Sequence, residues 1–293
     1  MNSDHPLNPS LYAPAEDEVA FFKSQTGIDN DEELRSHIFA IQEEAYKIYP
    51  YPCIHRFGFA QFNISRQPYY QQLLNLGKDC KGIYVDLGCC VGTGARKAVM
   101  DGYPIKQIIA SDLRPEFWEI GHKLFKSTPE TFPARFIPAD IFDLEGLSKE
   151  EAGPVSDISK VQSLAELRGN VSAIHASALF HLFNEEEQSK LAKIIASLLS
   201  SAPGSMIFGT QSGRPEGRNY LKTARNNRDR YDMFCHSPES WKSFWDGGVF
   251  PKGTVRVDAS LHETAVRLSE LMILTDETST ENYYFLTWCI TVL

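Results

Sequence analysis

A glycine-rich turn follows an acidic residue at the end of a short apolar run. The run IYVDLGCCVGTG places Gly88, Cys90 and Gly92 at every second position after Asp86. Glycines in such a turn let the backbone approach a ligand, and the amino end of the following helix favours anionic or oxygen-rich groups. The turn therefore predicts a binding site for a nucleotide-like ligand.

Two common nucleotide motifs fit this turn poorly. A phosphate-binding loop needs GxxxxGK[ST], but no Gly-Lys pair follows Gly88. A dinucleotide fingerprint needs a third glycine, and Lys97 stands where it should follow Gly92 and Gly94. An oxidoreductase that uses a nicotinamide therefore stays an alternative that rests on the fold alone.

Two more aspartates end the next apolar runs. Asp112 ends QIIASD, where a carboxylate can accept hydrogen bonds from both hydroxyls of a ribose. The alternative is that Asp112 caps the helix that starts near Pro115. Asp140 ends the third run, RFIPAD. Because charged residues seldom close buried strands without a partner, the three acids predict one ligand site.

Histidines supply the candidates for catalysis. His175 and Ser177 lie in and just after the fourth apolar run, and His181 follows in SALFHLF. We expect His181 to be a base or a substrate clamp, with packing in a loop as the alternative. His175 fits a cofactor contact or a core position better than catalysis. His236 either reaches the acceptor, as a second catalytic candidate, or caps the helix near Pro238.

Short β-branched runs alternate with amphipathic helical segments after residue 81, as in βαβ units. The expected strands are 83–87, 107–111, 134–139, 171–176, 205–210, 254–261 and 283–293. The expected helices are 93–101, 115–126, 161–167, 184–201 and a short one near 240–245. This order predicts an α/β fold with a Rossmann-like, mostly parallel seven-stranded sheet whose last strand is antiparallel, over residues 81–293.

Residues 1–80 are expected to form a helical N-terminal cap. The apolar positions from Leu34 to Ile48 recur at spacings of three and four, which predicts an amphipathic helix stopped by Pro50. An aromatic group follows, which is either the core of the cap or the apolar wall of a substrate pocket. Its members are Tyr49, Phe57, Phe59, Tyr69 and Tyr70.

The composition limits the partners. With 29 Lys+Arg and 38 Asp+Glu the formal net charge is −9, which disfavours nucleic acid and anionic membranes. No apolar run approaches the ~18 residues of a membrane helix, and the amino terminus lacks a secretory pattern, so a cytoplasmic protein is expected. The six cysteines show no zinc spacing, so we expect reduced thiols and no metal.

The segment 214–230 departs from this acidic background. It contains six Lys/Arg and two Asp/Glu. Either it captures a carboxylate, or it is a solvated loop after the fifth strand, since charge runs usually face water.

The pattern Asp86-x-Gly88-x-Cys90-x-Gly92 resembles motif I of the class I S-adenosylmethionine-dependent methyltransferases. The resemblance implies S-adenosyl-L-methionine as cofactor, with Asp86 orienting its cationic amine and Gly88 and Gly92 leaving room beside it. Cys90 replaces the family's usual middle glycine, so its thiol should narrow the pocket.

The same resemblance assigns roles to the next strand ends. Asp112 would bind the ribose, with Leu113 beside it. Asp140 would bind the adenine amino group, with Ile141 covering the ring. His175 would be a further cofactor contact.

A narrower resemblance covers roughly residues 50–245. The stretches CIHRFGFAQFNISRQPYYQQLL, VDLGCCVG, ASDLRPEFWEIGHKLF, ADIFD, AIHASALFHLF and MFCHSPESW look like fungal methyltransferases of secondary-metabolite pathways. The best-known members methylate the carboxyl group of farnesylated dimethylorsellinic acid in meroterpenoid synthesis. The resemblance implies a bulky hydrophobic acid or phenol as substrate, and a carboxyl O-methyltransferase as function.

The chemistry of the acceptor decides whether a base is needed. A carboxylic acid, with a pKa near ~4, is already ionised at neutral pH, whereas a phenol, near ~10, would benefit from a histidine. The alternatives are therefore a phenol O-methyltransferase that uses His181, and a non-catalytic protein that binds S-adenosylmethionine. A homodimer is the default expectation for such enzymes.

Overall fold

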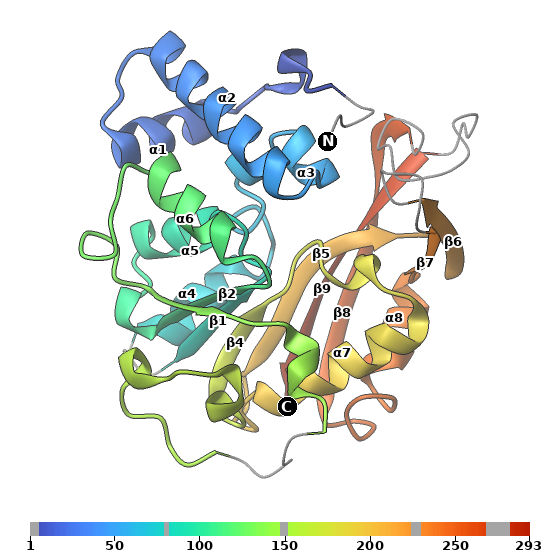
Figure 1. The fold of residues 1–293 in the computed structure, drawn as a ribbon. Helices are drawn as coiled ribbons and strands as arrows, with labels where there is room; N and C mark the ends of the chain where they lie inside the picture. Colours follow the sequence, from blue (N-terminus) through green and yellow to red (C-terminus); the bar gives the residue numbers. More distant parts are fainter. Residues whose placement is uncertain (1–5, 79–81, 147–151, 224–229, 268–281) are drawn as a thin grey trace.

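The computed structural model describes residues 6–78, 82–146, 152–223, 230–267 and 282–293. Seven strands form one mixed sheet in the order β3-β2-β1-β4-β5-β9-β8 (Figure 1). They are β1 (Ile83–Leu87), β2 (Ile108–Asp112), β3 (Arg135–Pro138), β4 (Val171–His175), β5 (Met206–Gly213), β8 (Val255–Arg267) and β9 (Asn282–Val292).

The strand directions confirm the predicted fold class. Neighbours among β1 to β5 pair in parallel, and β9 lies antiparallel between β5 and β8. The last strand in the chain is thus the one that runs against the others. The result is the predicted Rossmann-like sheet.

Helices cover both faces of this sheet. One face packs against α4 (Tyr70–Gly77), α5 (Thr93–Met100) and α6 (Pro115–Leu124), and the other against α7 (Glu185–Leu198) and α8 (Pro238–Trp245). Strand side chains fill both interfaces and are fully buried. Val85, Ile174 and Ile207 pack toward α7 and α8, and Tyr84, Ala173 and Phe208 pack toward α4 and α5. Burial on both faces explains why these strands read as continuous apolar runs.

The N-terminal residues form a separate helical group. It contains η1 (Pro9–Leu11), α1 (Glu16–Thr26), α2 (Asp31–Ile48), α3 (Pro52–His55) and η2 (Gly58–Ala60). Asn30 caps α2 by accepting the Glu33 N–H at 3.0 Å, and the helix ends at Ile48 before Pro50, as predicted. Figure 1 shows α2 lying along α6.

The aromatic group divides between core and surface. Phe57 and Phe59 are buried in a hydrophobic cluster that α1, α2 and α6 share. Tyr49, by contrast, is 37% exposed, and the Arg114 guanidinium lies 4.6 Å from its ring centroid. The core interpretation therefore holds for the phenylalanines, while Tyr49 lies on the rim of the cap beside the end of β2.

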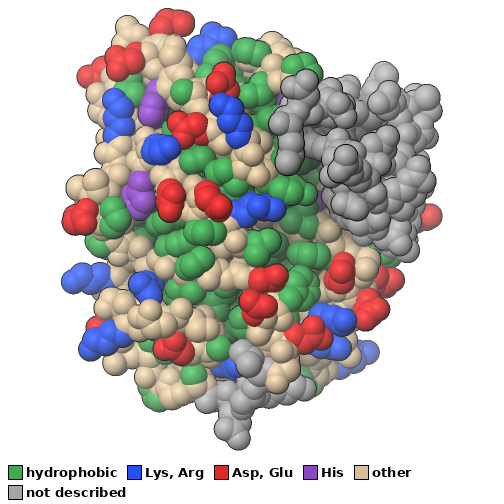
Figure 2. All heavy atoms as spheres, in the orientation of Figure 1, with side chains coloured by type: hydrophobic (Ala, Val, Ile, Leu, Met, Phe, Trp, Pro, Cys, Tyr) green, Lys and Arg blue, Asp and Glu red, His purple; other side chains and the backbone are tan. Residues whose placement is uncertain are grey.

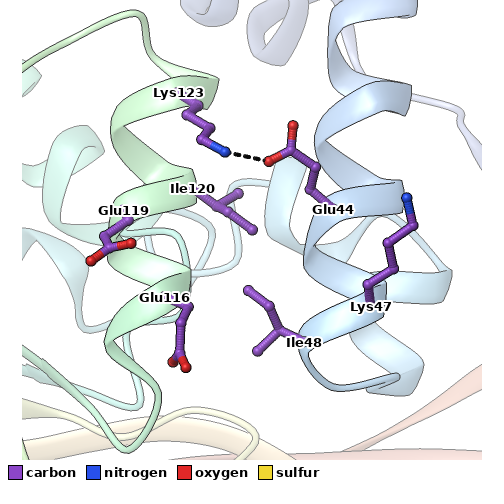
Figure 3. A pocket seen from close by; sticks show the side chains of 7 residues that line it. All are labelled: Glu44, Lys47, Ile48, Glu116, Glu119, Ile120 and Lys123. Carbon is purple, nitrogen blue, oxygen red and sulfur yellow. Dashed lines mark hydrogen bonds and ion pairs between the residues drawn. The ribbon is translucent and has the colours of Figure 1, made fainter.

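A groove of about 250 Å³ follows the contact between α2 and α6 (Figure 3). Ile48 and Ile120 form its apolar floor, and an ion pair of 2.6 Å joins Lys123 to Glu44 across it. Its other charged side chains are Lys47, Glu116 and Glu119. The groove is the polar edge of a helix contact.

Figure 2 shows both signs of charge interspersed over one face of the molecule, with apolar side chains gathered in its centre.

The expectation of a loop over 214–230 is wrong in part. Strand β5 continues to Gly213, and a two-stranded antiparallel hairpin follows, made of β6 (Arg218–Thr223) and β7 (Arg230–Cys235). Residues 224–229 lie outside the described residues. Arg214, from the same basic segment, is buried and donates through Nη1 to the Asn282 carbonyl at 2.9 Å.

A smaller difference concerns a helix that is present as separate short turns. The helix expected over 161–167 is replaced by two turns, η5 (Ile158–Lys160) and η6 (Leu164–Leu167). Further turns are η3 (Ile105–Gln107), η4 (Ile141–Leu144) and η7 (Phe180–Leu182).

Within the described ranges, no helix has the length and apolar character needed to cross a membrane.

Candidate active site at the carboxyl ends of the strands

The turn after β1 has the backbone that its glycines predict. Gly88 and Gly92 have φ of +70° and +75°, in the left-handed region that favours glycine. The Gly88 N–H donates to the Ser111 carbonyl at 2.8 Å, which holds the turn against β2. Beside Gly88 the space is open, because the nearest atom to an added Cβ would be Leu179 Cδ1 at 3.8 Å.

Gly92 has a different reason to be glycine. A Cβ on Gly92 would lie 2.5 Å from a ring carbon of Trp118 on α6. The missing side chain of Gly92 thus admits Trp118, so the space at Gly92 is taken by a helix contact. The space beside Gly88 is open, and its use by a ligand stays a prediction.

Cys90 also adopts a left-handed conformation, with φ of +50°. A residue with a Cβ is strained there by about 1–2 kcal/mol. Its side chain packs against the cluster that the cap shares with α6, and burial raises the pKa of the thiol well above its usual value. The Cys90 side chain therefore contacts the cap, whereas the sequence predicted that it would narrow the pocket.

Asp112 ends β2, as predicted, and ties this turn together. Its Oδ2 accepts the Cys90 N–H at 2.9 Å, and its Oδ1 accepts the Arg114 N–H at 3.0 Å. Burial raises the pKa of Asp112, these two backbone hydrogen bonds lower it, and repulsion from Asp86 raises it further. Each oxygen keeps a second lone pair for a ligand hydroxyl. The neighbouring Leu113 is 56% exposed.

Asp140 lies two residues beyond β3, next to the end of β2. The Ala139 N–H donates to the Asp112 carbonyl at 3.1 Å, which joins the two strand ends. Asp140 is exposed, and its Oδ1 accepts the Phe142 N–H at the start of η4. Ile141 is buried at 7% exposure. Two carboxylates and two apolar side chains therefore flank this edge of the sheet.

Asp86 and His175 form a buried pair at the ends of β1 and β4. The distance from Asp86 Oδ1 to His175 Nδ1 is 2.8 Å, and the two residues are 3% and 7% exposed. The other ring nitrogen, Nε2, lies 2.7 Å from Ser177 Oγ. A hydrogen-bonded chain thus runs from Asp86 through His175 to Ser177.

Gln67 extends this chain from the segment before α4. Its Nε2 lies 3.3 Å from Ser177 Oγ and 3.5 Å from His175 Nε2. Sequence reasoning missed Gln67, since a glutamine in SRQPYY carries no signal for a partner 110 positions away.

His181 lies on η7 beside β5. Its Nδ1 accepts the Ser212 N–H at 3.3 Å. Because a neutral imidazole whose Nδ1 accepts must carry its proton on Nε2, Nδ1 is not available as a base here.

His236 lies in an aromatic cluster below α8. Its Nδ1 is 2.9 Å from Ser240 Oγ, and its ring packs 5.0 Å from the centroid of Trp241. Ser237 is the residue that caps α8, with His236 directly before it. Burial lowers the pKa of His236 to about 4. The predicted helix cap is therefore Ser237 and not His236, and a catalytic role of His236 stays a prediction.

Among the described residues, no group of three or more His, Cys, Asp or Glu side chains could hold a metal ion. The donor set at the strand ends is instead made of carboxylates, an open glycine backbone and apolar side chains. Such a set fits a ligand with hydroxyl, ammonium and aromatic parts.

Comparisons with known proteins agree with the motifs. Residues 7–60 match the family model of the meroterpenoid methyltransferase N-terminal domain. O-methyltransferase phiE from a fungal species (strain ATCC 74256) is 29% identical over 74% of this chain and 66% of its own length.

Two further fungal relatives are somewhat more similar over shorter alignments. O-methyltransferase atr3 from Stereocaulon alpinum is 32% identical over 62% of this chain and 48% of the relative. Asnovolin E/Chermesin D methyltransferase nvfJ from Aspergillus novofumigatus is 35% identical over 60% of this chain and 58% of the relative. The chain thus spans about half to two thirds of the relatives that it matches. These matches confirm the predicted resemblance: the chain is similar to fungal O-methyltransferases.

Proposed function

We propose that this protein is an S-adenosylmethionine-dependent O-methyltransferase that methylates the carboxyl group of a hydrophobic polyketide or meroterpenoid intermediate. One observation carries the proposal. Three carboxylates, Asp86, Asp112 and Asp140, lie at the ends of adjacent strands around an open glycine turn, in a chain that is similar to fungal O-methyltransferases.

The residues at the strand ends fit the parts of this cofactor. Asp112 offers free lone pairs to the ribose hydroxyls, and exposed Leu113 offers an apolar surface to the adenine ring. Asp140 and Ile141 would hold the other side of the base. Asp86 would attract the ammonium group, and Gly88 would leave room beside it. When bound, S-adenosylmethionine supplies a methyl group on a positively charged sulfur.

The protein's own task is then to position and desolvate an oxygen nucleophile. We propose that residues 1–80 serve as a cap over the site. In support, the Thr93 hydroxyl at the start of α5 donates to the Phe59 carbonyl at 2.6 Å, and Gln67 reaches Ser177. The basic segment after β5 lies largely outside the described side chains, and we keep carboxylate capture by this segment as a proposal.

A hydroxyl acceptor is the second candidate, because the chain from Asp86 through His175 to Ser177 could take a proton. A carboxylate acceptor would not use it, whereas a phenol would. His181 no longer serves this candidate through Nδ1, which accepts a backbone N–H.

Calorimetric titration of S-adenosylhomocysteine and, separately, NAD tests the cofactor. We expect micromolar binding of the former, weakened about tenfold to a hundredfold in Asp112→Ala, because hydrogen bonds to a charged group contribute about 1.5–3 kcal/mol each. Asp29→Ala, which removes an exposed carboxylate on the cap, is the control. Tighter binding of NAD would instead support an oxidoreductase.

Turnover separates an enzyme from a binding protein. With S-adenosylmethionine and a panel of prenylated aromatic acids, mass spectrometry should detect a methyl ester. Cofactor binding with no transfer to any member of the panel would favour the non-catalytic alternative.

A further inference from the structure

The direction of the hydrogen bonds at Ser177 follows from the groups around it. An ionised Asp86 only accepts, so the proton of a neutral His175 lies on Nδ1, 2.8 Å from the carboxylate. Nε2 of His175 is then an acceptor, and the Ser177 hydroxyl must donate to it across 2.7 Å. The arrangement is that of an acid, an imidazole and a hydroxyl aligned for proton transfer.

The two lone pairs of Ser177 Oγ are both in use. The Thr210 N–H on β5 donates to one at 3.1 Å, and the Gln67 amide donates to the other at 3.3 Å. The Thr210 donor is a backbone N–H that the sheet holds in place, whereas the Gln67 donor belongs to a side chain that can move. Gln67 therefore occupies the one position at Ser177 that another hydroxyl could take.

The carbonyl oxygen of the Gln67 amide lacks a hydrogen-bond donor among the described residues. Gln67 is only 6% exposed, and this Oε1 atom is buried. A buried acceptor without a donor is unfavourable by about 1–3 kcal/mol. The amide is thus held in an orientation that leaves one of its atoms ready for a donor.

We propose that Ser177, His175 and Asp86 form a proton relay for an acceptor that enters the site as a neutral hydroxyl, with Gln67 filling the outer position of the relay until the acceptor arrives. The proposal rests on the proposed methyl transfer and applies to its second candidate, a hydroxyl acceptor such as a phenol or enol, because a carboxylate is already ionised and needs no relay. It also replaces His181 as the base.

One proton moves along the relay as the methyl group is transferred. The acceptor hydroxyl gives its proton to Ser177 Oγ, while Ser177 passes its own proton to His175 Nε2. The acceptor oxygen forms the new bond to the methyl carbon, and the bond from that carbon to sulfur breaks with its electron pair left on sulfur. The His175 imidazolium stays paired with Asp86 and returns its proton to solvent after the product leaves.

Gln67 also has a role once His175 is protonated. Nε2 of His175 then donates to Ser177 Oγ, so the Ser177 proton must turn to another acceptor. Rotation of the Gln67 amide would bring Oε1, which now lacks a donor, to face it. The same side chain can thus serve the relay in both of its protonation states.

Nuclear magnetic resonance of the histidine rings tests the relay without any acceptor. In the complex with S-adenosylhomocysteine, we expect the neutral ring of His175 to carry its proton on Nδ1, facing Asp86. Ser177→Ala should shift the Nε2 resonance, whereas Ser172→Ala, on the same strand, should not. A proton on Nε2 in the neutral ring of His175, or an Nε2 resonance that Ser177→Ala leaves unchanged, would overturn the relay.

Turnover of two simple probes gives the kinetic test. A dihydroxybenzoate methyl ester has free hydroxyls and a methylated carboxyl. A dimethoxybenzoic acid has methylated hydroxyls and a free carboxyl. Ser177→Ala should lose about a hundredfold or more in kcat/KM on the ester, as general-base catalysis contributes 10²–10⁴-fold, and its pH profile should lose the rising limb. Ser177→Thr, which keeps the hydroxyl, should recover part of the rate.

The two proposals fail in different ways. Absence of S-adenosylhomocysteine binding would reject the methyltransferase itself. Binding together with an equal loss on both probes in Ser177→Ala would reject the relay and leave Ser177 as a structural residue.

Discussion

At the scale of single residues, hydrogen bonds compensate for strain in the glycine turn. Cys90 sits at a φ that suits glycine, yet its N–H donates to Asp112 and its side chain packs against the cap. Two neighbouring strand ends and the cap therefore meet at one residue. A change at Cys90 should affect both the turn and the cap.

His236 makes the stability of the fold sensitive to acid. Its pKa is lowered from 6.5 to about 4 by burial, so the unfolded chain takes up the proton first as the pH falls. The stabilisation from the neutral ring is complete above pH 6.5 and is lost between pH 6.5 and pH 4. The difference corresponds to about 3 kcal/mol.

Chemical denaturation at pH 7, 5 and 4 measures this effect. His236→Gln, which cannot titrate, should lose less stability than the wild type over this range, by up to about 3 kcal/mol. His262→Gln, at an exposed histidine on β8, should behave like the wild type. Equal pH dependence in wild type and His236→Gln would show that His236 is not held neutral.

The site could be predicted from the sequence only where the chain itself sets the geometry. Asp86 and Asp112 end parallel strands, and such ends always share an edge, so their placement followed from the pattern of runs. Gln67 and Ser177 meet only through tertiary packing. His236 is buried against Trp241, a position that local sequence does not distinguish from a ligand-facing one.

At the scale of elements, close contact between α6 and the glycine turn positions the site. Gly121 on α6 faces the Val91 carbonyl so closely that a Cβ there would overlap with the backbone oxygen. Trp118, one turn earlier, fills the space that Gly92 leaves. The helix and the turn thus fit each other through two glycines, one on each element.

Gly121→Ala should therefore push α6 away from the turn. We expect a loss of about 1–3 kcal/mol in the free energy of unfolding, as for other overpacked sites, together with weaker S-adenosylhomocysteine binding. Gly153→Ala, where the added methyl meets nothing within 4 Å, is the control. Unchanged ligand affinity in a destabilised Gly121→Ala would show that α6 does not set the shape of the turn.

The hairpin of β6 and β7 shows where element prediction fails. Its sequence is rich in Arg, Lys and Asn, which are typical of a solvated loop. The strands pair with each other and not with the main sheet, so no long apolar run marks them. The buried strands of the main sheet, by contrast, could be predicted because both of their faces are covered.

At the scale of the whole molecule, the N-terminal helices share one hydrophobic cluster with α6 and with Val91 of the glycine turn. Glu18 on α1 is buried and accepts the Phe62 N–H at 2.8 Å, and the cluster joins Phe21 and Phe22 to Phe125 beyond α6. Ligand binding at the turn should therefore also stabilise the N-terminal helices.

Linkage gives the expected size of this effect. S-adenosylhomocysteine at a hundred times its Kd should stabilise the protein by about 2.7 kcal/mol, and NAD at the same concentration should not. Hydrogen exchange should slow both in residues 88–92 and in residues 58–67. Slower exchange in the turn alone would contradict a cap that is coupled to the site.

The position of β9 has a consequence for how the chain is made. β5 pairs with β4 only through Met206 to Phe208, while β9 pairs with it along its whole length. During synthesis β5 leaves the ribosome well before residues 282–292, so an apolar strand edge next to the site stays open until they emerge. Such an edge attracts other chains. Chaperones that cover this edge during expression should therefore raise the yield of folded protein.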